Sequence, residues 1–69
     1  MALKKLKPQN EDRVDWEISV TNALCERLDC SYSDASGILG AHADLIDRLY
    51  TAGTTPADAA VQLDAVDAA

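Results

Sequence analysis

Large apolar residues recur at the spacing of an amphipathic helix between residues 33 and 52. They follow an i, i+1, i+7, i+8, i+11, i+12 pattern, which places them on one stripe of a helix. Ser33 precedes the stripe as an N-cap would, and Gly53 follows it as a helix C-terminus would. The stripe comprises Ile38, Leu39, Leu45, Ile46, Leu49 and Tyr50. The sequence therefore predicts one long central helix over residues 33–52.

A first helix is predicted over residues 10–28, with Asn10 as its N-cap. Its main apolar face carries Val14, Ile18, Thr21, Leu24, Cys25 and Leu28. Trp16 and Val20 widen this face to an arc of about 220° on the helical wheel. Because a small neighbouring helix would leave part of that arc open, we expect Trp16 and Val20 to be uncovered and to form a dimer or partner face.

The joint before the third helix carries the clearest local signals in the chain. Gly53 is expected to end the central helix in a left-handed conformation, and Thr55 to cap the next helix. Pro56 then takes the first helical position, and Asp58 lies three residues after the cap. These signals predict a short third helix over residues 56–66. Its expected buried residues are Ala57, Ala60, Val61 and Leu63.

Together these elements predict an all-α fold, a small three-helix bundle with a long central helix over 33–52 and a short third helix. Residues 1–9 are expected to be a flexible basic arm, and residues 10–69 a single acidic domain. The expected core is Leu45, Ile46 and Leu49, with Ile18, Leu24 and Leu28 packed against them.

The composition favours helices and gives no sign of a membrane segment. Of 69 residues, 48% are hydrophobic, but aromatics are 4% and Phe is absent, so Leu, Ile, Val and Ala must build the core. No run approaches the ~18 apolar residues of a membrane span. The basic N-terminus has no apolar region behind it, unlike a secretory signal, so we expect a cytoplasmic protein.

The net charge of −6 is unevenly distributed. Residues 14–69 hold two bases against ten acids, a net of −8. The other bases are Lys4, Lys5, Lys7 and Arg13. An acidic body repels phosphate backbones and keeps a small protein soluble. It is either a solvated surface with a short basic tail or a face that docks on a basic partner.

Residues for catalysis or metal binding do not fall into a recognisable pattern. His42 is the single histidine, and no nucleophile lies at a spacing that argues for assembly with it. Cys25 and Cys30 are separated by four residues, which is not a zinc-site spacing. We therefore expect no enzyme activity, no cofactor and no metal.

Two glycines interrupt the outer face of the predicted central helix. Gly37 and Gly40 share that face with Asp44 and Asp47, and each glycine costs a helix ~1 kcal/mol relative to alanine. Either the helix starts late or kinks there, or the glycines allow another backbone to approach, from the third helix or from a partner.

The segment from Leu28 to Leu39 reads LDCSYSDASGIL, and Ala23 stands in the helix before it. This pattern is similar to the turn and recognition helix of bacterial helix-turn-helix regulators, and the resemblance implies DNA binding by residues 23–39 together with the basic arm. Two departures count against that function. Asp29 replaces the turn glycine, and the exposed positions include no Lys or Arg to donate to phosphates and guanines. Those positions are Tyr32, Ser33, Asp34, Ser36 and Gly37.

These observations favour a small acidic helical protein-interaction module, an adaptor, inhibitor or accessory protein without catalytic activity. A homodimer is an open alternative, as are the helix-turn-helix function and a nucleic-acid-mimicking inhibitor of the kind found in mobile elements. The candidate partner-binding residues are Trp16, Val20, Gly37, Gly40, Asp44 and Asp47.

Overall fold

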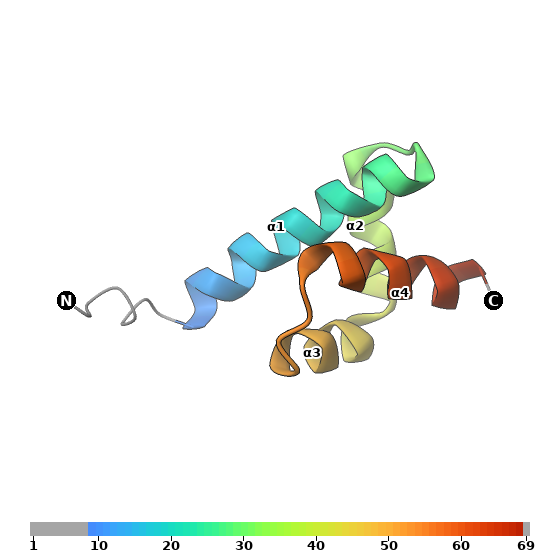
Figure 1. Cartoon of the computed structure of the whole chain (residues 1–69). Coiled ribbons are helices and arrows are strands. Elements are labelled where there is room, and N and C mark those ends of the chain that lie inside the picture. The colour runs from blue at the N-terminus through green and yellow to red at the C-terminus, as the bar shows by residue number, and fades with distance from the viewer. Residues whose placement is uncertain (1–8, 69) are drawn as a thin grey trace.

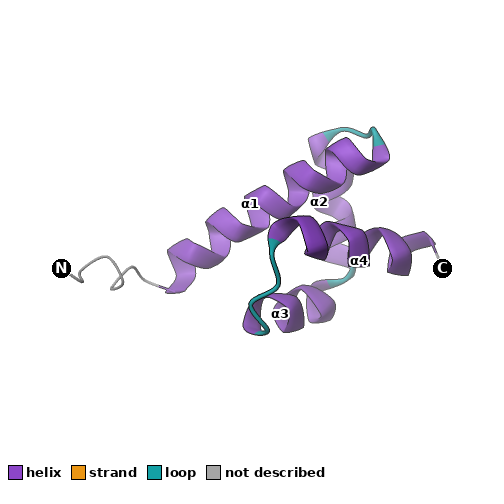
Figure 2. Ribbon diagram, viewed as in Figure 1, coloured by secondary structure: helices purple, strands orange, loops and turns teal. Residues whose placement is uncertain are grey.

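A computed structural model of the chain describes residues 9–68, which form four helices (Figures 1 and 2). The helices are α1 (Gln9–Leu28), α2 (Tyr32–Ala41), α3 (Ala43–Thr51) and α4 (Pro56–Ala68). No strand occurs within 9–68, so the all-α class is confirmed. The predicted count of three helices is wrong. The proposed basic arm lies outside the described residues, except that Gln9 already belongs to α1.

The predicted central helix is interrupted at His42, which separates α2 from α3. His42 leaves the helical region, at φ −118° and ψ 43°, and its N–H is shared between the carbonyl oxygens of Ile38 and Leu39, each at 3.2 Å. A straight helix over 33–52 would be roughly 30 Å long and would carry its apolar stripe past the small core. The bend instead brings Leu39 and Ile46 into one cluster.

The N-caps of the first two helices also differ from the prediction. Ser31, not Ser33, caps α2: its backbone is extended, and its hydroxyl oxygen accepts a hydrogen bond from the Asp34 N–H at 3.1 Å. Ser33 lies within the first turn. Likewise α1 begins at Gln9, so Asn10 is inside the helix and not before it.

The joint between α3 and α4 forms as its sequence predicts. Gly53 adopts a left-handed φ of 77°, and the Thr54 N–H closes the end of α3 on the Leu49 carbonyl at 3.0 Å. The Thr55 hydroxyl oxygen then accepts from the Asp58 N–H at 3.2 Å, with Pro56 as the first residue of α4.

The core lies where α4 packs along α1, with α2 and α3 closing it from the other sides (Figure 1). α1 makes its most extensive packing with α4 and its next most extensive with α2. Among residues 9–68, nine apolar residues are buried: Val20, Leu24, Ala35, Leu39, Ile46, Leu49, Ala59, Ala60 and Leu63. Every helix contributes to this single cluster.

Helix α4 is longer than predicted, and its buried face is the predicted one only in part: Ala60 and Leu63 are buried as expected. It continues to Ala68, and Ala59, Ala60 and Leu63 are its buried residues. Ala57 is exposed and Val61 is 44% exposed, so their predicted burial is wrong. The difference arises because α4 turns the side with Ala59, Ala60 and Leu63 toward α1. An Ala-rich helix has no strong apolar stripe, so its sequence does not reveal which side faces inward.

The docking of α4 also changes which side of α1 is covered. Val20 is fully buried, so the expectation that Trp16 and Val20 stay uncovered is wrong. Ile18 is 43% exposed, so its predicted place in the core is wrong too, whereas Leu24 is fully buried and Leu28 is half-buried. Ile46 and Leu49 are buried as expected, and Leu45 is half-buried.

Trp16 ties α1 to the joint between α3 and α4. Its indole N–H donates to the Thr54 carbonyl oxygen at 2.8 Å, across 38 positions of sequence. Its ring also meets Tyr50 edge-on, with the ring centroids 5.3 Å apart. This half-buried tryptophan therefore has a structural role within the chain.

Replacing Leu63 by Ala should lower the free energy of unfolding by ~2–5 kcal/mol, because the fully buried side chain leaves a cavity at the α1–α4 contact. The matched control is Val61→Ala on the same helix, where the exposed side chain should make a difference of about 0.5 kcal/mol. Urea denaturation followed by circular dichroism measures both. Equal effects for the two variants would contradict the observed face of α4.

Candidate functional site

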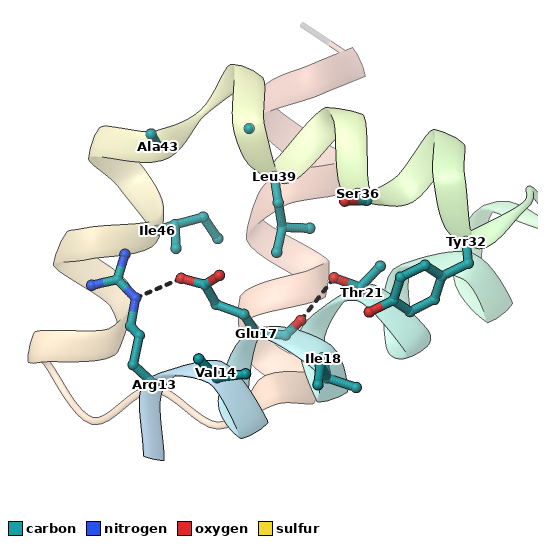
Figure 3. A pocket seen from close by; sticks show the side chains of 11 residues that line it. Arg13, Val14, Glu17, Ile18, Thr21, Tyr32, Ser36, Leu39, Ala43 and Ile46 are labelled. Atoms are coloured by element: carbon teal, nitrogen blue, oxygen red, sulfur yellow. Dashed lines mark hydrogen bonds and ion pairs between the residues drawn. The ribbon is translucent and has the colours of Figure 1, made fainter. Parts of the chain in front are cut away.

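An open groove of about 330 Å³ runs between α1 on one side and α2 and α3 on the other (Figure 3). Its floor is formed by the buried residues Thr21, Leu39 and Ile46. Val14 and Ile18 on α1 face this floor from one wall. The opposite wall is made by Tyr32, Ser36, Gly40 and Ala43. Three helices thus contribute to one solvent-accessible hollow.

Exposed apolar side chains concentrate around this groove. Among the described residues, five large apolar side chains are exposed, and three of them line the groove: Val14 (55%), Ile18 (43%) and Tyr32 (47%). The other two, Val61 and Val66, are on α4 and are not part of it. A cluster of exposed apolar groups around a concave surface is typical of a binding site.

The groove floor presents no unsatisfied polar side chain. The Thr21 hydroxyl donates to the Glu17 carbonyl oxygen at 2.7 Å, as the dashed line in Figure 3 shows. No buried side-chain nitrogen or oxygen within the described residues lacks a partner. The floor therefore suits an apolar group, because a polar ligand would find few partners there.

Ion pairs close one end of the groove and join α1 to α3. Arg13 forms a 2.6 Å contact with the Glu17 carboxylate and another 2.6 Å contact with the Asp47 carboxylate. Hydrogen bonds, first to Glu17 and then to Asp47, raise the pKa of Arg13 above its ordinary value, so the guanidinium stays charged. The guanidinium carbon of Arg13 also lies 5.4 Å from the centroid of the Tyr50 ring, within the range of a cation–π interaction.

The predicted partner-binding residues fall in different places. Gly40 lines the groove, and Asp47 lies at its closed end. Asp44 borders a second, shallow hollow that shares Gly40 and Ala43 with the groove. Gly37 is exposed on α2. Trp16 and Val20, by contrast, take part in the packing of α1 described above and do not line the groove.

The sequence did not single out Val14 and Ile18 as surface residues, whereas Tyr32 is exposed as the sequence predicts. Val14 and Ile18 belong to the apolar face of α1, and periodicity alone assigns such a face to the core. Their signal was the breadth of that face, which exceeds what one neighbour covers. The choice of which part stays open depended on where α4 docks.

The two glycines of α2 face open space. A Cβ atom added to Gly37 or to Gly40 would meet no neighbouring heavy atom within 4 Å. Within the described residues, therefore, no backbone approaches them, and α4 is not the reason for their small size. The helix runs through Gly37, and its interruption comes at His42, two residues after Gly40.

The turn before α2 is the segment that the helix-turn-helix resemblance assigns to the turn of that motif. Asp29, at the position of the family's glycine, adopts a positive φ of 55° in a short turn between α1 and α2. The exposed face of α2 nevertheless carries Asp34 and no base. Asp29 thus takes a backbone conformation that usually favours glycine, while the helix after it lacks the donors that read DNA.

The remaining reactive side chains are separate from the groove. Cys25 and Cys30 are free thiols, and desolvation, with smaller effects from Cys25 and Asp34, raises the pKa of the Cys30 thiol. A raised pKa keeps the thiol protonated and weakly nucleophilic at neutral pH. His42 contacts the Asp67 carboxylate at 3.4 Å. In the part of the chain that the structure describes, no group of three His, Cys, Asp or Glu is arranged to hold a metal.

Comparisons of this chain with protein-family models, with curated proteins and with solved structures find no significant match. None of the described helices combines the length and the apolar character needed to cross a membrane.

Replacing Gly37 or Gly40 by Ala should raise the free energy of unfolding by ~0.5–1 kcal/mol each, because the added methyl group meets open space and alanine favours the helix. Gly53→Ala is the opposite control: its φ of 77° is strained for alanine, so that variant should lose ~1 kcal/mol. Thermal melts compare the three. A destabilised Gly37→Ala would show that something does cover this face.

Proposed function

We propose that this chain is a small, acidic, non-catalytic protein-interaction module, an adaptor, inhibitor or accessory protein acting in the cytoplasm. The observation that carries the proposal is the groove between α1 and α2–α3. It gathers three of the five exposed large apolar side chains of the described residues around a buried floor of Thr21, Leu39 and Ile46.

Energetics support a protein partner for this surface. Removing apolar area from water contributes about 25 cal/mol per Å², so leaving Val14, Ile18 and Tyr32 exposed in the free chain is unfavourable relative to covering them. The groove is open and shallow, and its lining is mostly exposed, so a small molecule would keep much of its surface in water. A protein segment can cover the whole groove.

The chemistry of the side chains supports a binding role over catalysis. The histidine contacts a carboxylate at the end of α4, away from the groove. The Cys30 thiol has a raised pKa, the opposite of what an activated nucleophile needs. The two free thiols also fit a reducing compartment such as the cytoplasm.

A photo-cross-linking amino acid placed at Ile18 tests this proposal in cells that produce the protein naturally. We expect one protein to be captured from position 18, because this side chain projects beside the groove. The matched control is the same amino acid at Val61, which is similarly exposed (44%) but lies on α4. Capture of the same proteins from both positions, or capture from neither, would contradict the groove as an interaction surface.

DNA binding is the competing function, and the positive φ of Asp29 is the observation in its favour. The charge opposes it. Arg13 already pairs with two carboxylates, so Lys4, Lys5 and Lys7 would have to supply the phosphate contacts. Three contacts give a slope of log K against log salt of about −2.7 and weak binding at physiological salt.

We therefore expect no duplex DNA binding at physiological salt in a fluorescence anisotropy titration. Replacing Lys4, Lys5 and Lys7 by Gln should abolish any binding seen at low salt. Tight, sequence-dependent binding that survives this triple replacement would establish a helix-turn-helix function and overturn the proposal.

A further inference from the structure

We propose that the partner segment that fills the groove is a basic amphipathic α-helix. This inference rests on the proposed function, because it names the occupant of the same groove. Shape, hydrogen bonding and charge each point to that occupant.

The shape of the groove suits a helix laid along it. Val14 and Ile18 form an i, i+4 ridge on α1, and Tyr32, Ser36 and Gly40 form an i, i+4, i+8 row on α2. Side chains on that row decrease in size toward Gly40, where open space lies above the helix. A partner helix can therefore approach α2 closely there while its apolar side chains reach the floor.

Hydrogen bonding separates a helical occupant from an extended one. An extended peptide needs partners for its backbone N–H and C=O groups, and it usually finds them on the edge of a sheet. Residues 9–68 contain no strand, and no buried side-chain polar atom among them is unpaired. A helix satisfies its own backbone and needs only an apolar surface from its partner.

Charge selects a basic helix. None of the exposed acids lines the groove itself, so the attraction for a basic partner comes from the net charge of −9 that residues 9–68 carry. The groove's own base, Arg13, is already paired with Glu17 and Asp47. Lysines and arginines on the rim of a partner would be attracted to this net negative charge and would speed association.

The same charge argues against two other occupants. Residues 9–68 contain three bases and twelve acids, a net of −9, so a second copy would bring two strongly acidic surfaces together. Nucleic acid would be repelled in the same way. The chain's own residues 1–8 carry Leu3, Leu6 and three lysines, so they have the right chemistry and must be distinguished by experiment.

The test measures binding of a synthetic helical peptide to the full chain by fluorescence anisotropy. The peptide carries leucine at i, i+3, i+4 and i+7 positions and lysine or alanine elsewhere. A reordered peptide of the same composition loses the helical spacing of its leucines but keeps the charge. We expect the reordered peptide to bind at least about ten-fold more weakly, since charge alone does not fill the groove.

Matched variants of the full chain locate the binding. Ile18→Asp should weaken peptide binding by about ten-fold or more, whereas Val61→Asp should change it by less than about two-fold. Asp44→Asn should lower the association rate, and Asp58→Asn should not. Asp44 and Asp58 both lie in the first turn of a helix, so each replacement removes the same favourable interaction with a helix dipole. Asp58 is the control because it is on α4, which does not line the groove.

Each contrary outcome has a distinct meaning. If a peptide with glutamate in place of lysine binds the groove as tightly, the basic helix is wrong, while the groove remains an interaction surface. If no helix of either charge binds and Ile18 captures no protein in cells, the proposed function fails as well. Equal binding of the reordered peptide would reduce the effect to charge attraction and overturn the inference.

Two further measurements exclude the other occupants. If Leu3→Ser combined with Leu6→Ser tightens peptide binding about ten-fold, the chain's own residues 1–8 fill the groove and the inference is overturned. If the chain alone sediments as a dimer and Ile18→Asp makes it a monomer, a second copy is the occupant instead. Unchanged affinity in the first case and a monomer in the second support a partner helix.

Discussion

The packing of α4 along α1 is the constraint on which the rest of this structure depends. Val20 and Leu24 of α1 and Ala59, Ala60 and Leu63 of α4 belong to one buried cluster. The buried residues Ala59 and Ala60 have small side chains, which permit close packing of two helices in a chain without Phe. Once α4 covers this side of α1, the side that carries Val14 and Ile18 is left to α2 and α3.

The groove follows from incomplete coverage on that second side. The bend at His42 lets Leu39 and Ile46 both reach the core, and the same bend separates α2 from α3 beside α1. Small residues at Ser36, Gly40 and Ala43 do not fill the remaining space. The exposed apolar ridge and the open space at Gly40 thus have a common origin, and the partner helix that we propose would complete the packing that the chain begins.

Electrostatics then narrow what such a helix can be. Arg13 is held by Glu17 and Asp47, so it closes one end of the groove and leaves little positive charge for an acidic partner. The net charge of −9 over residues 9–68 disfavours both self-association and nucleic acid. Stability and the proposed recognition therefore rest on different groups: the apolar core organises the fold, and the acids would select the partner that we propose.

The sequence by itself determined the helical class, the α3–α4 joint and the acidic character, because caps, left-handed glycines and charge are local properties. Gly53, Thr55 and Pro56 needed no tertiary information. The Ser31 cap of α2 is also local, although the sequence analysis assigned it to Ser33. Only the tertiary structure decided that the central helix bends at His42. It also decided which part of the broad arc of α1 is buried, and so placed Val20 in the core and Ile18 at the groove. An Ala-rich α4 carries too weak a periodic signal to predict its docking, and that docking, a non-local event, selected the exposed face.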